Sequence, residues 1–153
     1  MTVEFLALCD LAEVALRAVE SAGHGIDDRP ELALATMRRW AYGGASLDEV
    51  EEAAEAATDA WSLAFETPAA TAYGAVDWLC LGAQDDLDAV DAELRDKVFE
   101  NVRDTLVALG EAPEAASARV SETLQIRLAV RRVALAQTDR RAGLRLVRRG
   151  DWS

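Results

Sequence analysis

The sequence predicts an all-α fold: a single-domain bundle of about six helices, with a long basic helix at the C-terminal end. No long stretch alternates polar and apolar residues with the two-residue period of a half-buried strand. Glycines, prolines and capping residues instead recur at intervals of helical length. The 153 residues, 51% of them hydrophobic, suit one domain (residues 1–153) around one core.

The first helix is expected at about residues 4–22. Its polar residues Asp10, Glu13, Arg17 and Glu20 are spaced three, four and three apart, which places them on one narrow stripe of the helix. Because the rest of the helix is apolar, we expect it to be largely buried. Glu13 and Arg17 are expected to pair along the stripe at i,i+4 spacing.

The second helix is expected to begin near Pro30, since proline suits the first helical position. Either Asp27 or Asp28 can cap it, because a carboxylate accepts hydrogen bonds from the free N–H groups of a helix start. Gly43–Gly44 should end the helix. Trp40 falls on its apolar side and is expected to be buried among the first three helices.

The third and fourth helices have distinct start signals. Ser46 and Glu49 form the S-x-x-E pattern of a capping box. Thr67 is expected to cap the fourth helix, with Pro68 as its first residue. The fourth helix is apolar nearly all round and reads as the central one, and Gly74 within it predicts a close crossing with a neighbour.

The fifth and sixth helices are expected at about residues 86–109 and 113–142. Gly110 and Gly143 should end them, because glycine tolerates the left-handed backbone that often closes a helix. Leucine and arginine alternate briefly over residues 144–153, and either a short strand or a frayed helix fits that pattern.

Charge divides the chain into an acidic body, residues 1–116, and a basic C-terminal helix and tail, residues 117–153. The body holds 7 Lys+Arg and 25 Asp+Glu, a net charge of −18, whereas the remainder holds 9 Arg and 3 Asp+Glu, a net charge of +6. Opposite charges of this size indicate that the tail docks on its own body or on that of a second copy, or that it reaches an anionic partner such as nucleic acid.

Arg127, Arg131 and Arg132 recur among aliphatic residues and are the candidates for tail docking or anion contact. Arginine without lysine suits fork-shaped pairing with carboxylates, which we expect on the third and fifth helices. Since the acidic body repels phosphate, docking is favoured over nucleic acid. A homo-oligomer joined by this contact is the other alternative.

The sequence contains no constellation that supports catalysis, so no enzyme activity is expected. His24 is the only histidine, and the cysteines Cys9 and Cys80 lie in apolar helical stretches where buried thiols are inert. No Cys-x-x-Cys or His-x-x-x-His spacing occurs, which predicts no metal and no cofactor. With no signal peptide and no apolar run of ~18 residues, a cytoplasmic protein that makes no membrane contact is expected.

Residues 9 to about 83 resemble the α-helical immunity proteins associated with bacterial polymorphic toxin systems. The resemblance covers about half of the chain and does not extend to the arginine-rich C-terminal part. It is carried by Cys9-Asp10-Leu11-Ala12-Glu13, Asp27-Asp28-Arg29-Pro30, Ala35, Arg39-Trp40-Ala41, Gly43, the Ser46/Glu49 start, the alanines 53, 54, 57 and 60, and Pro68-Ala69-Ala70-Thr71-Ala72.

The resemblance implies a cytoplasmic protein that neutralises a toxin by stoichiometric binding. A basic toxin, such as a nuclease, would be attracted by the acidic body. The candidate partner-binding faces are Glu51, Glu52, Glu55 and Asp59 on the third helix and Asp85, Asp86, Asp88 and Asp91 at the start of the fifth. The motif residues Asp27, Asp28, Arg29, Pro30 and Trp40 are interpreted as structural.

Overall fold

The computed structural model describes residues 3–84 and 90–150, with side chains as far as residue 143. All regular structure in these two ranges is helical and forms one bundle, which confirms the all-α prediction. The helices are α1 (Val3–Ser21), α2 (Asp28–Ala41), α3 (Leu47–Leu63), α4 (Ala69–Ala83), α5 (Ala92–Ala108) and α6 (Pro113–Gly150).

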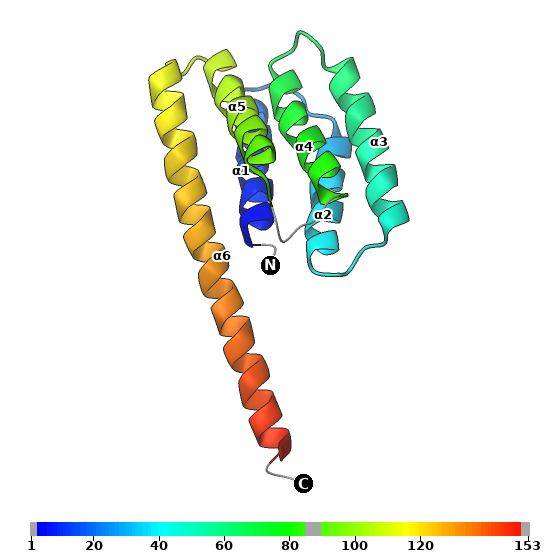
Figure 1. Cartoon of the computed structure of the whole chain (residues 1–153). Coiled ribbons are helices and arrows are strands. Elements are labelled where there is room, and N and C mark those ends of the chain that lie inside the picture. The colour runs from blue at the N-terminus through cyan, green and yellow to red at the C-terminus, as the bar shows by residue number, and fades with distance from the viewer. Residues whose placement is uncertain (1–2, 85–89, 151–153) are drawn as a thin grey trace.

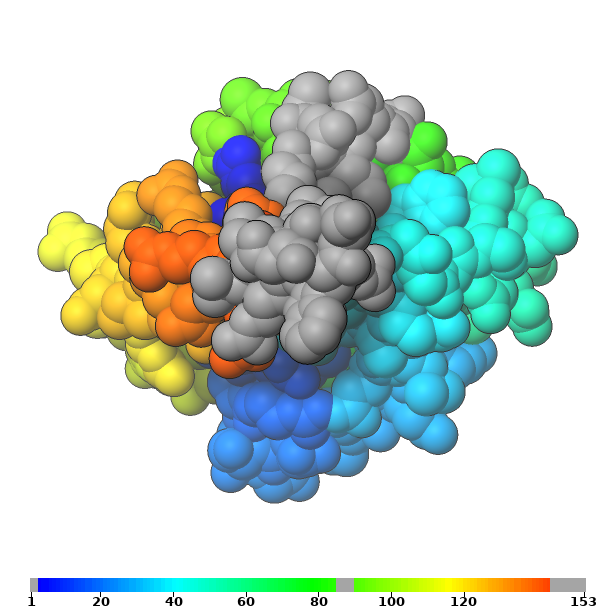
Figure 2. Space-filling view, turned by 90° about the horizontal axis from the view of Figure 1, so that it is seen from below, coloured from blue at the N-terminus to red at the C-terminus, as the bar shows by residue number. Residues whose placement is uncertain are grey.

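Helices α1 and α4 lie at the centre of the bundle, while α3 and α6 lie at opposite edges (Figure 1). The view from below shows the same arrangement, with α3 in cyan on one side and α6 in yellow to orange on the other (Figure 2). α1 is buried along most of its length, as its narrow polar stripe predicts. A Cβ at Gly74 would lie 2.6 Å from the Asn101 side chain, so α4 and α5 do cross closely there.

Several helix ends that short-range sequence patterns predict are confirmed. The Asp27 carboxylate caps α2 and accepts a hydrogen bond of 2.9 Å from the backbone N–H of Arg29. Both hydrogen bonds of the Ser46/Glu49 capping box are present at the start of α3. Gly43 adopts a positive φ of 78° just after α2, a conformation that glycine takes without steric cost.

Two predicted helix starts are wrong. The Thr67 hydroxyl does not cap α4 but donates to the carbonyl of Ala64, 2.6 Å away, in the preceding turn. α5 begins at Ala92, six residues later than predicted, because the Asp91 carboxylate accepts from the backbone N–H of Leu94 and caps the helix there. Asp85, Asp86 and Asp88 lie outside the described residues.

The predicted end of α6 at Gly143 is also wrong, since the helix continues to Gly150. One glycine in a helix costs only about 1 kcal/mol relative to alanine. Its neighbours Ala142 and Leu144 are good helix formers, and the surrounding arginines are too, so the helix passes through. Of the two conformations considered for residues 144–153, residues 144–150 are helical.

Trp40 is half-buried, which corrects the prediction that it is buried among the first three helices. Its indole Nε1 donates a hydrogen bond of 2.8 Å to the carbonyl of Ala83. The last carbonyls of a helix have no partner within the helix, so the carbonyl of Ala83 at the end of α4 is free to accept this bond from the indole N–H.

The predicted Glu13–Arg17 pair is also wrong: Arg17 pairs with Glu20, and Glu13 pairs with Arg38.

Candidate functional site

A buried carboxylate on α1 holds the C-terminal helix against the body. The Asp10 side chain is only 6% exposed, and guanidinium nitrogens of Arg38, Arg127 and Arg131 lie 3.0, 2.9 and 2.7 Å from its oxygens. α1 supplies the carboxylate, α2 supplies one arginine and α6 supplies two. We call these four residues the Asp10 cluster. It joins helices more than a hundred residues apart in the sequence.

Electrostatics keep Asp10 ionised within this cluster. Burial raises the pKa of Asp10, but the hydrogen bonds from Arg131, Arg127 and Arg38 outweigh it and bring the pKa below its ordinary value of 3.8. The same contact raises the pKa of Arg131. A carboxylate that stays charged and has both oxygens engaged is unsuited to general acid–base chemistry, which needs a pKa near the working pH. The Asp10 cluster is therefore a structural anchor for α6.

Arg127 and Arg131 thus have a partner on α1, so the prediction that their partners lie on the third and fifth helices is wrong. The reason is that α6 packs along α1 and α5, on the opposite edge of the bundle from α3. Arg132 points elsewhere: it is exposed and lines a hollow of about 510 Å³ together with Glu4 and Arg95. It makes no ion pair with any side chain that the structure describes.

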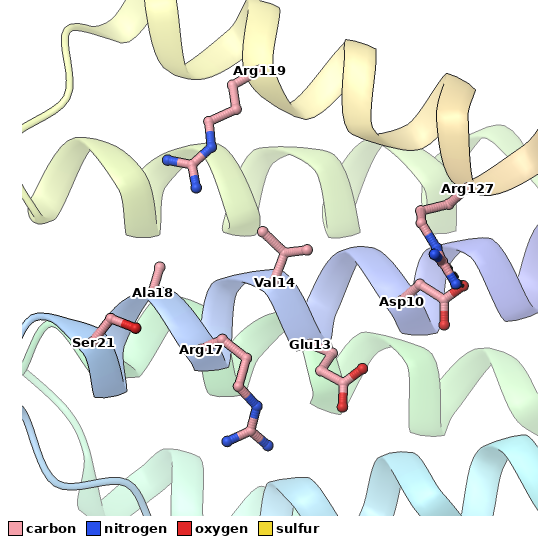
Figure 3. Close-up of a pocket in the computed structure, with 8 residues that line it drawn as sticks. All are labelled: Asp10, Glu13, Val14, Arg17, Ala18, Ser21, Arg119 and Arg127. Carbon is pink, nitrogen blue, oxygen red and sulfur yellow. Dashed lines mark hydrogen bonds and ion pairs between the residues drawn. The ribbon is translucent and has the colours of Figure 1, made fainter.

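A groove of about 440 Å³ runs between α1 and α6 beside the Asp10 cluster (Figure 3). Its charged side chains already have partners of opposite charge: Arg17 pairs with Glu20 and Glu31, and Arg119 pairs with Glu111. The groove consequently offers little free charge to select an ionic ligand. It is lined by Asp10, Glu13, Val14, Arg17, Ala18, Ser21, Arg119 and Arg127.

The acidic residues predicted on the third helix form an exposed face of α3. Glu51, Glu52, Glu55 and Asp59 are all exposed, and no basic side chain in the described part of the chain lies within ion-pair distance of them. α3 itself contains no lysine or arginine. Among the described helices α3 packs on α2 and α4 alone, so its outer face is not covered by another of these helices.

The face of α3 ends in an apolar residue that the sequence analysis did not single out. Leu63 is 77% exposed and lies eleven residues, or about three turns, after Glu52, so it shares the side of the helix that Glu52, Glu55 and Asp59 occupy. This spacing was the available signal in the sequence. A hollow of about 370 Å³ adjoins Leu63 and is also lined by His24 and Tyr73. We call Glu51, Glu52, Glu55, Asp59 and Leu63 the α3 surface.

Asp91 and the motif residues Asp27, Asp28, Arg29 and Pro30 lie outside α3, and several of them have structural contacts of their own. Asp91 is engaged as the cap of α5, and α5 does not pack on α3. Asp27 pairs with Arg29 at 2.6 Å and its backbone N–H donates to the Tyr73 hydroxyl, also at 2.6 Å, which ties the turn before α2 to α4. In the same motif Asp28 is exposed and Pro30 is buried.

The side chains with catalytic potential are one exposed histidine and two buried thiols. His24 is exposed in the turn after α1, while Cys9 and Cys80 are buried and burial raises the pKa of each thiol to about 12. In residues 3–84 and 90–150 no three His, Cys, Asp or Glu side chains gather as a metal site would require. Every helix in the same ranges is either too short or too polar to cross a membrane.

Comparisons with known proteins add no relative: no family model, no curated protein and no solved structure matches the chain.

Proposed function

We propose that this protein is a non-catalytic binding protein of the immunity type, which neutralises a basic toxin in the bacterial cytoplasm by forming a stoichiometric complex through the α3 surface. The observation that carries the proposal is the composition of that surface. It presents four exposed carboxylates, none of which forms an ion pair with a described side chain, and it ends at the exposed side chain of Leu63.

In such a complex, charge raises the association rate, whereas buried apolar area stabilises the bound state. The acidic body, with its net charge of −18, attracts a basic protein and speeds the encounter, and the effect weakens as salt rises. Leu63 at the end of the α3 surface and Phe65, two residues after it, are 77% and 71% exposed and supply apolar area that a stable interface would bury. The resemblance to immunity proteins supports a toxin as the partner.

The test uses the protein encoded beside this gene, purified in an inactivated form, as the binding probe. The variant Glu52→Lys/Glu55→Lys reverses the charge of the α3 surface. We expect it to bind the neighbouring toxin at least about tenfold more weakly, chiefly through a slower association rate. The matched control is Glu93→Lys/Asp96→Lys, which makes the same charge change at two exposed positions of α5.

The control should bind within about threefold of the parent chain. Protection of a bacterial host that expresses the active toxin should be lost for the first variant and kept for the second. Equal binding by both variants would show that the α3 surface is not the contact. A neighbouring gene product that neither binds nor is neutralised would refute the proposed function.

A nucleic-acid-binding function is the second candidate, and the exposed arginines of the second half of α6 favour it. Arg132, Arg140 and Arg141 all lie on the surface there. Successive phosphate contacts would give binding to a generic duplex that falls steeply with salt. Because the body carries −18, we expect no measurable duplex binding at physiological salt. Micromolar binding would reverse the order of the two candidates.

A further inference from the structure

The long helix α6 leaves the body after Arg131. Up to that point it is docked: Ala116, Val120 and Leu124 are buried, and Arg131 bonds to Asp10. From residue 132 to residue 143 every side chain is exposed except that of Leu135, which is half-buried. With 38 residues, α6 is about 57 Å long at 1.5 Å per residue, and its second half extends past the end of the bundle (Figure 1).

An exposed apolar stripe marks the point at which α6 leaves the body. Ile126, Val130 and Val133 are 54%, 45% and 58% exposed and are spaced four and three residues apart, so they lie on one face of the helix. This face differs from the one that holds Leu124 and Leu128 against the bundle. We call the three residues the α6 stripe. A β-branched stripe at this spacing is typical of the seam between two paired helices.

We propose that the α6 stripe is a self-association surface, on which α6 of a second copy packs in the antiparallel direction. Charges beside the stripe favour this occupant. Glu122 and Arg140 lie about five helical turns apart and therefore on the same side of the helix, one before the stripe and one after it. Both are exposed, and neither forms an ion pair within the described part of the chain.

In an antiparallel pair whose two-fold axis passes near residue 131, within the second half of the stripe, Glu122 of each copy lies at the level of Arg140 of the other. Val130 of each copy then lies within about one residue of the level of Val133 of the other, so these valines form the apolar centre of the contact. A parallel pair would instead place Glu122 beside its own counterpart and Arg140 beside its own counterpart, which is repulsive. The positions of Glu122 and Arg140 therefore favour α6 of a second copy as the partner of the stripe, and they favour antiparallel over parallel packing.

The wider charge distribution favours the same arrangement. Antiparallel packing places the docked half of one α6, together with its acidic body, beside the projecting half of the other. Residues 1–116 carry −18 and residues 117–153 carry +6, so each basic half meets the acidic body of the second copy. Figure 2 shows α6 and α3 on opposite sides of the bundle, so a contact through α6 leaves the α3 surface free and does not depend on the proposed function.

The test is the concentration dependence of sedimentation of the full chain. We expect the parent protein to form a dimer at about 100 µM that dissociates on dilution. Val130→Glu should weaken the dimer at least about tenfold, because it places a carboxylate in the apolar seam. The matched control is Leu32→Glu, which makes the same type of change at a 63% exposed position of α2. Circular dichroism should show unchanged helix content in both variants.

Charge exchange tests the direction of packing. Glu122→Arg and Arg140→Glu should each weaken the dimer about tenfold, since each replaces two attractive pairs with two repulsive ones, and the double variant should restore it. Glu52→Lys/Glu55→Lys should leave the dimer intact, which separates this inference from the proposed function. A monomer at 100 µM, an unaffected Val130→Glu variant or a double variant without restoration would overturn the proposal.

Discussion

Replacing Asp10 with asparagine tests the central structural claim, that one buried carboxylate anchors α6. Asp10→Asn keeps the shape of the side chain and removes its charge. The guanidinium groups of Arg38, Arg127 and Arg131 then lie within hydrogen-bond reach of a neutral amide. Among the side chains that the structure describes, Glu13, which pairs with Arg38, is the one other carboxylate that forms an ion pair with these arginines.

The size of the effect follows from burial. Removal of one partner from a buried ion pair costs about 3–5 kcal/mol of folding free energy, because charge is left buried without compensation. The three arginine side chains are 20–36% exposed, so water screens part of the repulsion that appears among them. We therefore expect Asp10→Asn to lower the free energy of unfolding by about 3 kcal/mol, toward the lower end of that range.

Urea denaturation followed by circular dichroism measures the change directly. Limited proteolysis should show cleavage within α6 of Asp10→Asn at protease levels that leave the parent chain intact, since an unanchored helix opens more often. Asp139→Asn is the control: it makes the same chemical change at an exposed position of α6 and should alter stability by less than about 0.5 kcal/mol. A loss below about 1 kcal/mol for Asp10→Asn would refute the anchoring role.

The pH dependence of stability gives a second reading of the same contact. The folded pKa of Asp10 lies below its ordinary value of 3.8, so its stabilising contribution is complete above about pH 4 and is lost as the pH falls from 3.8 through the folded pKa. The parent chain should therefore lose more stability below pH 4 than Asp10→Asn does. Parallel stability curves for the two proteins in that range would contradict the assignment.

Three further predictions concern packing and reactivity. Trp40→Phe should lower the free energy of unfolding by about 1 kcal/mol, because the carbonyl of Ala83 loses the indole N–H that donates to it. An unchanged urea denaturation curve would contradict this hydrogen bond. Gly82→Ala should cost about 1–3 kcal/mol, because the new Cβ would collide with the Leu94 side chain; a stabilised variant would show that the contact yields freely. Both cysteines should resist a thiol reagent at pH 8 in the native protein and react in urea, since burial raises the pKa of each to about 12; rapid native labelling would contradict their burial.

Helix identity and most helix starts follow from short-range patterns, and these were predictable. The Ser46/Glu49 capping box and the Asp27 cap act within three residues, so no knowledge of the tertiary structure is needed to find them. Where two local signals compete, the prediction failed. The start of α5 shows this, because a cluster of aspartates precedes Val90 while the side chain that caps the helix belongs to Asp91.

The candidate contacts on α3 were also readable, since helical spacing alone places Glu52, Glu55 and Asp59 on one face. Their continuation into Leu63 follows the same spacing. Helical spacing does not predict how exposed each side chain is. Leu63 and the buried Val50 are both aliphatic residues of α3, and only the packing of α3 against α2 and α4 shows which of them is exposed to water.

The sequence by itself determined an all-helical chain, the capped starts of α2 and α3, and the separation of an acidic body from a basic C-terminal helix. These properties depend on residues within a few positions of one another, or on sums over the chain. Only the tertiary structure decided that Arg127 and Arg131 engage Asp10 and that α6 projects beyond residue 131. An ion pair between helices depends on which edges of the bundle meet, and that is settled by the packing of apolar faces across more than a hundred residues.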